Sequence, residues 1–165
     1  MRIGIARLCA ALIMLVLTTT FLQATTSSPA QAAGCYGTGC DDKGPKGNGC
    51  FADRVSVASG GDNYTRLYYS RACNAFWAWS KNGQLYWGTE VHLEMQALVS
   101  KGGSVYQWEF RKRLIINKPT MQSNSDPEWT NALGARTNNF RFRALWVDSA
   151  GGGIVATPWA RGGAR

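Results

Sequence analysis

Three titratable side chains at two-residue spacing are the first candidates for chemistry in this 165-residue sequence. Glu90, His92 and Glu94 alternate with apolar residues, so on a β-strand all three project from one face. Such a row suits metal binding or proton transfer, and Glu90 with Glu94 would serve as the carboxylate pair of a small hydrolase. The sequence favours the alternative, a hydrated strand face whose charges are balanced by arginines on the next strand.

No nucleophile motif accompanies this row. His92 is the only histidine, so every Ser-His-Asp or Cys-His arrangement would have to use it. The chain contains neither Gly-x-Ser-x-Gly nor His-Glu-x-x-His. We therefore expect a binding role rather than an enzymatic one, with no catalytic residues, no cofactor and no bound metal.

Arginines interleaved with aromatic residues form a second candidate site. The basic members, which are the predicted ligand contacts, are Arg111, Arg113, Arg141 and Arg143; the aromatic members are Trp108, Phe110, Phe140 and Phe142. Guanidinium groups and rings on one surface would bind an anionic polymer, either a cell-envelope glycan or nucleic acid. For each residue taken singly, the favoured alternative is that alternation buries the ring and leaves the arginine in water.

A third candidate is the aromatic segment 76–88, FWAWSKNGQLYWG. Its Asn82-Gly83 pair is the best acceptor of a type I′ hairpin turn. Pairing across that turn places Trp79 opposite Tyr86 and puts Trp77 on the same side. These three rings would form a sugar-binding platform if exposed, but burial in a core is the favoured interpretation.

Two alternating segments, 90–99 and 104–113, predict a hairpin that carries the charged row. With Lys101-Gly102 as its loop, the apolar face pairs Leu93 with Phe110, Met95 with Trp108 and Ala97 with Tyr106. A loop at Gly102-Gly103 changes the partners but keeps the faces. In both registers Arg111 and Arg113 share the face of Glu90, His92 and Glu94.

The remaining patterns predict an all-β domain. Further strands are expected at 51–58, 64–72, 140–147 and 154–157. One short helix is expected over 125–134, because N-cap candidates, an early Pro127 and a terminal Gly134 bracket it. About seven short strands in antiparallel hairpins indicate a small barrel or sandwich.

Four cysteines predict two disulfides. Cys9 lies in the expected leader, which leaves Cys35, Cys40, Cys50 and Cys73 as an even set. Folding the hairpin about residues 60–63 brings Cys50 near Cys73, so we expect that bridge and the short-range bridge Cys35–Cys40. A zinc site is the weaker alternative, because the spacing is not Cys-x-x-Cys.

The N-terminus predicts export. Arg2 and Arg7 precede an apolar run from residue 8 to 17, and Ala30-Gln31-Ala32 is a cleavage site, so residues 1–32 are the expected signal peptide. Residues 33–50 form a Gly/Cys-rich stapled loop and 51–165 an antiparallel β domain, with 33–165 folding as one secreted, monomeric unit. Loss of two arginines lowers the formal charge of +8 to +6.

The cysteines also carry a resemblance. The pattern Cys-x-Gly-x-x-Cys at residues 35–40, Gly49-Cys50 with Asp53, and the run from Tyr69-Ser70 through Cys73 to Trp77-Ala78 resemble a family of small secreted bacterial proteins, sometimes called YjfA-like, whose domain has no known function. The match covers residues 35 to about 80, with Arg71 where the family commonly has proline. The resemblance implies secretion and a disulfide framework, and no activity.

The sequence as a whole thus predicts a secreted, disulfide-stabilised binding or interaction module at the cell envelope. The competing hypotheses are a small secreted hydrolase using Glu90 and Glu94, and a secreted toxin or inhibitor.

Overall fold

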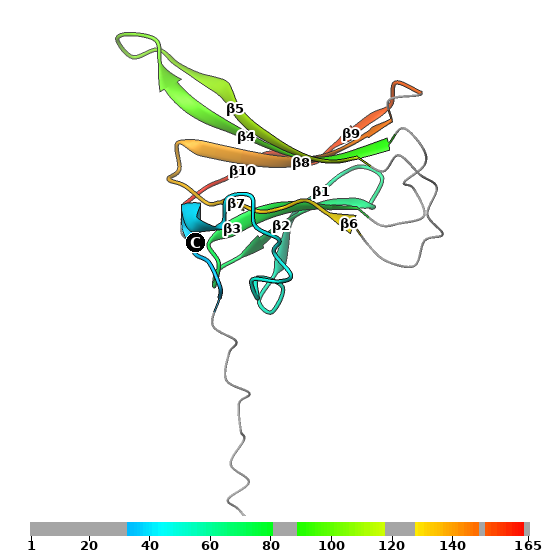
Figure 1. The fold of residues 1–165 in the computed structure, drawn as a ribbon. Coiled ribbons are helices and arrows are strands. Elements are labelled where there is room, and N and C mark those ends of the chain that lie inside the picture. Colours follow the sequence, from blue (N-terminus) through cyan, green and yellow to red (C-terminus); the bar gives the residue numbers. More distant parts are fainter. Residues whose placement is uncertain (1–32, 81–88, 118–127, 149–150, 164–165) are drawn as a thin grey trace, which may run out of the picture. The chain divides into compact units, whose positions relative to one another are not determined.

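The computed structural model describes residues 33–80, 89–117, 128–148 and 151–163. All of them lie in the compact unit Gln31–Arg165. Apart from one short 3-10 helix, η1 (Gly37–Cys40), the regular elements of these ranges are strands arranged in two antiparallel sheets. The all-β prediction is confirmed, and the two sheets face each other as a sandwich (Figure 1). No helix within the described ranges is long and apolar enough to cross a membrane.

The first sheet contains β1 (Val55–Ser59), β2 (Thr65–Ser70), β3 (Ala75–Ser80), β6 (Glu128–Trp129) and β7 (Leu133–Gly134). The turn between β1 and β2 forms because Asp62 accepts hydrogen bonds from the backbone N–H groups of Tyr64 and Thr65, at 3.1 and 3.0 Å. Asn63 adopts a left-handed φ of 56°, which asparagine tolerates. The strands predicted at 51–58 and 64–72 are therefore present, although β1 begins at Val55 and ends at Ser59, and β2 is shorter at both ends.

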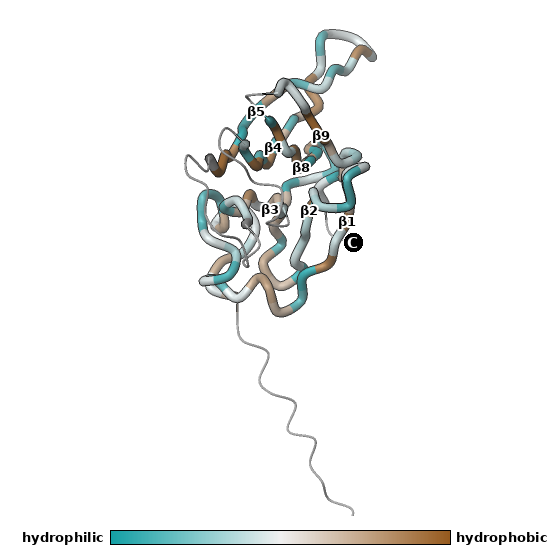
Figure 2. The backbone as a smooth tube through the Cα atoms, turned by 90° about the vertical axis from the view of Figure 1, so that its right-hand side faces the viewer, coloured by the Kyte–Doolittle hydropathy of each residue, from teal (hydrophilic) through white to brown (hydrophobic). Residues whose placement is uncertain are grey.

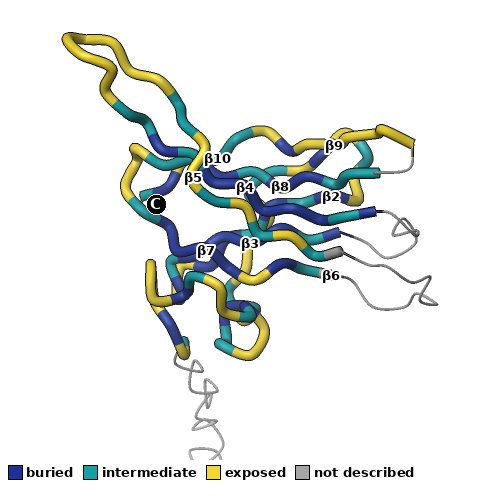
Figure 3. The backbone as a smooth tube through the Cα atoms, turned by 45° about the horizontal axis from the view of Figure 1, so that its top comes forward, coloured by how far each residue is buried: buried dark blue, intermediate teal, exposed yellow. Residues whose placement is uncertain are grey.

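The second sheet contains β4 (Thr89–Ser100), β5 (Tyr106–Asn117), β8 (Phe140–Asp148), β9 (Ile154–Ala156) and β10 (Ala160–Arg161). Its order is β10-β8-β4-β5, with β9 also paired to β8. The tip of the β4–β5 hairpin extends past the end of β8 and is exposed (Figure 3). The central strands β4 and β8 position most of the charged residues singled out from the sequence.

The main core lies between the facing sides of the two sheets. Leu67 and Phe76 from the first sheet pack with Val91, Leu93 and Phe142 from the second, all buried. Phe76 and Phe142 stack with ring centroids 4.5 Å apart. Apolar residues alternate with polar ones along β4, β5 and β8 (Figure 2), and alternation with a period of two gives each strand one face for this core.

The predicted register of the β4–β5 hairpin is wrong. Ser100 pairs with Tyr106, so the loop has five residues, 101–105, with Gly102 and Gly103 both at positive φ. A β-bulge then skips Arg111, because Met95 pairs with Lys112 while Gln96 pairs with Phe110. One extra residue in β5 reverses the faces to which the residues before it in the strand direct their side chains. Trp108 and Phe110 consequently leave the predicted apolar face and join the opposite one.

The helix predicted over 125–134 is also wrong where the structure describes it, since residues 128–134 contain β6 and β7. The backbone there bonds to other segments: Thr130 N–H donates to Ala78 O at 3.0 Å and Ala132 N–H to Lys43 O at 2.8 Å. Gly134 lies so close to Gly37 that a Cβ would approach its carbonyl oxygen to 2.0 Å. The glycine is thus required by close backbone packing and not by a helix terminus.

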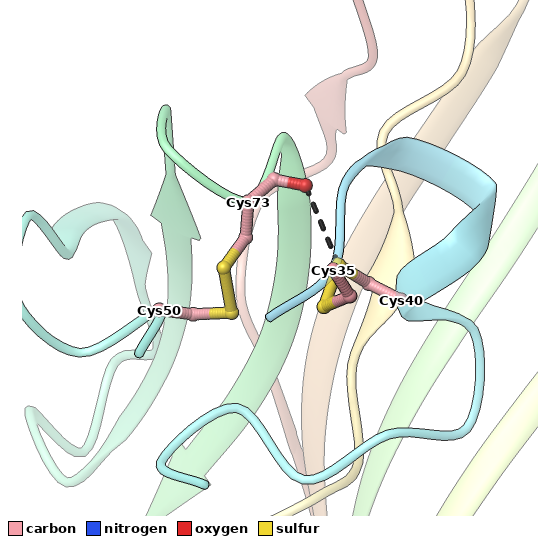
Figure 4. A group of neighbouring side chains, drawn as sticks. All are labelled: Cys35, Cys40, Cys50 and Cys73. Atoms are coloured by element: carbon pink, nitrogen blue, oxygen red, sulfur yellow. Dashed lines mark hydrogen bonds between the residues drawn. A yellow bond between two sulfur atoms is a disulfide. The ribbon is translucent and has the colours of Figure 1, made fainter. Parts of the chain in front are cut away.

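Both predicted disulfides are present, Cys35–Cys40 and Cys50–Cys73 (Figure 4). The four sulfur atoms lie within 4.8 Å of one another, and all four are joined in these two bridges. Among the described residues, this is the one cluster whose side chains could together hold a metal ion. The segment they staple covers the outer side of the first sheet. There the rings of Phe51 and Tyr68 each stack with the ring of Trp77, at 5.5 and 6.0 Å between ring centroids.

Asp53 accepts hydrogen bonds from Ser70 and Ala72, close to the Cys50–Cys73 bridge, and its contribution to stability should depend on pH. Burial acts to raise the pKa of Asp53, but hydrogen bonds from the Ser70 hydroxyl and the backbone N–H groups of Ala72 and Arg71 outweigh it and hold the pKa below its usual value. A carboxyl group whose pKa is lower folded than unfolded stabilises the fold fully above the unfolded value, and this stabilisation is lost as pH falls through the folded value. We expect Asp53→Asn to lower the unfolding free energy by about 1 kcal/mol at neutral pH.

Urea denaturation of both proteins from neutral pH down to pH about 3 measures this difference. The gap between the two curves should narrow toward the acid end, as pH falls through the lowered pKa of the wild-type Asp53 carboxyl group. A gap of constant size across the whole pH range would show that Asp53 acts through shape and not through its charge.

Candidate functional site: an arginine and tryptophan face

The outer face of the second sheet, opposite the core, carries most of the predicted basic residues. Even-numbered residues of β4 point to this side, among them Glu94 and Gln96, because Leu93 and Met95 point into the core. Arg143 pairs with Glu94 and Arg141 with Gln96 across the β4–β8 ladder, so both arginines share that face. On β5 Arg113 pairs with Glu94, and the bulge adds Trp108 and Phe110 to the same face.

Five side chains alternate on this face in the contact order Arg143, Trp159, Arg141, Trp108, Arg161; we call them the Trp–Arg stack. The guanidinium carbon of Arg141 lies 4.4 Å from the ring centroids of both tryptophans. Arg143 lies 4.5 Å from Trp159, and Arg161 lies 5.8 Å from Trp108. Each contact is within the range of a cation–π interaction. The rings therefore space three guanidinium groups along one surface.

Arg141 at the centre of the stack has no counter-ion among the described residues. Its Nε and Nη2 donate to the same amide oxygen, Gln96 Oε1, at 2.9 and 2.6 Å. Burial lowers the pKa of Arg141, and the positive charges of Arg143 and Arg161 lower it further. Even so, a guanidinium group stays protonated in proteins, so this one is a fixed positive charge held by neutral groups.

Glu94 organises the neighbouring part of the face. It is buried, with a side chain 3% exposed, and accepts hydrogen bonds from Arg113 on β5 and Arg143 on β8. The distance from Arg143 Nε to Glu94 Oε2 is 2.7 Å. The charge compensation favoured from the sequence is present, with Arg113 opposite Glu94 and not opposite Glu90. The expectation that this strand face is hydrated is wrong for His92 and Glu94, because the arginines that pair with Glu94 lie across the face and both residues are buried. Two arginines share one carboxylate, so this group adds net positive charge to the face.

The carboxylate and histidine row does not form an open acid–base site. His92 is buried and its Nε2 lies 2.6 Å from Glu90 Oε2, while Glu94 is enclosed by its two arginines. A general acid must reach a substrate through solvent-accessible space. The geometry therefore gives no support to the carboxylate-pair hydrolase.

Some predicted contacts lie elsewhere. Arg111 is the bulged residue and bonds to Glu109, which is on the opposite side of β5 from Trp108. Trp77 is 0% exposed and belongs to the second, smaller core, as the favoured interpretation had it. Trp79 is half-buried on the first sheet beneath Arg66, whose guanidinium carbon lies 5.5 Å from its ring centroid. Tyr86 and the turn at Asn82-Gly83 lie outside the described residues.

Three members of the site were missed from the sequence: Gln96, Trp159 and Arg161. In Trp159-Ala160-Arg161 the ring and the arginine are two residues apart, so on a strand they share one face, and the segment follows Pro158. A two-residue strand is too short for alternation to identify. Its pairing with β8, Arg161 opposite Arg141, is what brings these residues to the face.

The fold and the site together define a disulfide-stabilised, all-β sandwich protein with a positively charged aromatic face. No family model, curated protein or solved structure matches the chain.

Proposed function

We propose that this protein is a secreted, non-catalytic module that binds an anionic polymer of the cell envelope, such as an acidic glycan, through the Trp–Arg stack. The observation that carries the proposal is Arg141, a guanidinium group fixed between two indole rings and bonded only to an amide among the described residues. Its fixed position lowers the entropy that a ligand-binding arginine usually loses.

The charge balance of the site supports a negatively charged partner. The stack and the groups hydrogen-bonded to it contain one carboxylate, Glu94, and four arginines: Arg113, Arg141, Arg143 and Arg161. Such an excess attracts polyanions over the range of the Debye length. The two disulfides are compatible with an extracellular location. Membership of the YjfA-like family is likewise a proposal, resting on residues 35–80 alone.

The stack also favours a chain-like ligand over a single ion. The guanidinium carbons of Arg141 and Arg143 lie 4.4 and 4.5 Å from the same indole centroid, which limits their separation to 8.9 Å. Arg161 extends the row on the other side of Arg141. Several charges in a row bind a polymer with repeated acidic groups more strongly than any one of them binds an isolated anion.

We expect Arg141→Gln to weaken binding of dextran sulfate by at least about tenfold, because a hydrogen bond to a charged group contributes about 1.5–3 kcal/mol. Arg141→Lys should weaken it almost as much, since an ammonium group keeps the charge but neither stacks between two rings nor forms the planar fork. Binding is measured by biolayer interferometry on immobilised dextran sulfate at near-physiological salt, with neutral dextran as the ligand control.

The matched control is Arg71→Gln, which removes the same charge from an exposed turn between β2 and β3. It should retain nearly full affinity. An equal loss of dextran sulfate affinity in the Arg71 and Arg141 variants would mean that binding depends on net charge alone and that the face is not a specific binding site. Equally tight binding of oligothymidylate, sensitive to Arg141, would instead assign the face to nucleic acid.

A further inference from the structure

Three aromatic side chains follow one another on the outer face of β5; we call Tyr106, Trp108 and Phe110 the ring row. Each pairs with an even-numbered residue of β4, the set that points away from the core. Positions two residues apart on a strand are separated by roughly 6.6 Å, so the rings form a continuous strip. Tyr106 and Phe110 are 62% and 54% exposed.

Two features of the fold keep the ring row exposed. The bulge at Arg111 turns these residues away from the core, and β-bulges are frequent beside functional sites, where they redirect side chains. The β4–β8 ladder ends where Ala97 pairs with Phe140, so the hairpin tip that carries Tyr106 extends past β8 (Figure 3). A contiguous apolar surface in contact with water is typical of a binding surface.

The ring row is continuous with the Trp–Arg stack, because Trp108 belongs to both. The guanidinium carbon of Arg141 lies 4.4 Å from the Trp108 centroid, and that of Arg113 lies 5.5 Å from the Phe110 centroid. Gln96 pairs with Phe110 on one side and with Arg141 on the other, so these two residues are two strands apart, roughly 10 Å. One surface thus offers a row of positive charges and, beside it, a strip of rings.

The two rows suit different parts of one ligand. Guanidinium groups bind sulfate, carboxylate or phosphate groups through charge-assisted hydrogen bonds. The face of an aromatic ring is electron-rich and attracts the C–H groups that the faces of a pyranose ring present. Nucleobases also stack on such rings, but the two disulfides are typical of proteins outside the cytoplasm and so favour a glycan. A chain of phosphates has no apolar face to place on the rings.

From this arrangement we infer that Tyr106 and Phe110 bind the apolar faces of sugar rings. The polymer recognised is then an acidic polysaccharide and not a polyanion without rings, such as polyphosphate. The inference rests on the proposed function and deepens it, because it names the chemical class of the polymer. The Trp–Arg stack binds the acidic groups, and the ring row binds the pyranose rings that carry them.

The test compares dextran sulfate with inorganic polyphosphate, because only the first contains sugar rings. The double variant Tyr106→Thr/Phe110→Thr should weaken dextran sulfate binding about tenfold, since apolar contact with two rings is lost. Threonine keeps the strand preference, and both side chains are exposed, so the urea midpoint should not change. Polyphosphate affinity should equal that of the wild type. The salt dependence of dextran sulfate binding should also be retained, because the rings neutralise no charge.

The matched control is Tyr36→Thr, which removes a ring that is 65% exposed just before η1 and should leave both affinities unchanged. Equal losses for the two polyanions in the double variant, or an unchanged affinity for dextran sulfate, would overturn the inference. A larger loss for oligothymidylate than for dextran sulfate would also overturn it, because the rings would then stack on nucleobases. Arg141→Gln should weaken binding of both polyanions, and the absence of that effect would count against the proposed function itself.

Discussion

Removing the Cys50–Cys73 bridge should lower the free energy of unfolding by about 3.5 kcal/mol, and removing Cys35–Cys40 by about 2 kcal/mol. The reason is the length of chain that each bridge closes, since the cysteines are separated by 23 and 5 positions respectively. A longer closed loop removes more conformational freedom from the unfolded chain. The Cys50–Cys73 bridge also joins the N-terminal segment to the turn before β3, where Trp77 is buried.

The measurement is urea denaturation of the two double variants Cys50→Ala/Cys73→Ala and Cys35→Ala/Cys40→Ala beside the oxidised wild type. Thermal unfolding in dithiothreitol, with thiol titration to confirm reduction, should reproduce the combined loss. An unchanged melting temperature in the reduced protein would contradict a stabilising role for the bridges. A larger loss from the Cys35–Cys40 variant would mean that native packing around η1, and not chain entropy, sets the effect.

The second large effect is expected at Glu94. Removing both Arg113 and Arg143 should destabilise the fold by about 3 kcal/mol or more, because it leaves a buried carboxylate without a partner. Each single Arg→Ala variant should cost about 1 kcal/mol, since the other arginine still compensates the charge. The loss in the double variant should therefore exceed the sum of the single losses.

A double-mutant cycle in the Glu94→Gln background isolates this coupling. With a neutral side chain at position 94, losing both arginines should cost little beyond the ring contacts of Arg143 with Trp159 and of Arg113 with Phe110. Additive losses in both backgrounds would show that Glu94 is hydrated and that the three side chains do not act as one group. The cycle is read from urea midpoints at constant pH, with the slopes compared to confirm an unchanged transition.

Local patterns were sufficient for the β1–β2 hairpin of the first sheet and for the cysteine pairing. The Gly60-Gly61-Asp62-Asn63 turn and the two flanking apolar runs specify a hairpin, which brings Cys50 to Cys73. Alternation likewise identifies β4, β5 and β8. These features depend on neighbours within a few residues, so a short stretch of sequence contains the physical information that determines them.

The register of β5 could not be predicted from local sequence patterns. The bulge at Arg111 depends on which residues of β5 lie opposite Leu93 and Met95 at the core. Those pairs join residues of two strands that are well separated in the sequence, so a short stretch of sequence does not contain them. The same applies to the helix predicted over 125–134, for which Pro127 and Gly134 are the local signals, because the backbone groups of Thr130 and Ala132 bond to Ala78 and Lys43. Tertiary hydrogen bonds override weak local propensity in such segments.

The sequence by itself determined the fold class, the two disulfides and the interleaving of arginine with aromatic residues. It did not determine whether those residues share a surface, because one inserted residue in β5 reverses the face of Trp108 relative to Arg141. Only the tertiary structure places Trp159 and Arg161 beside that pair, through a two-residue strand that pairs with β8. A face built from four strands depends on register between segments far apart in the chain, and register follows from packing.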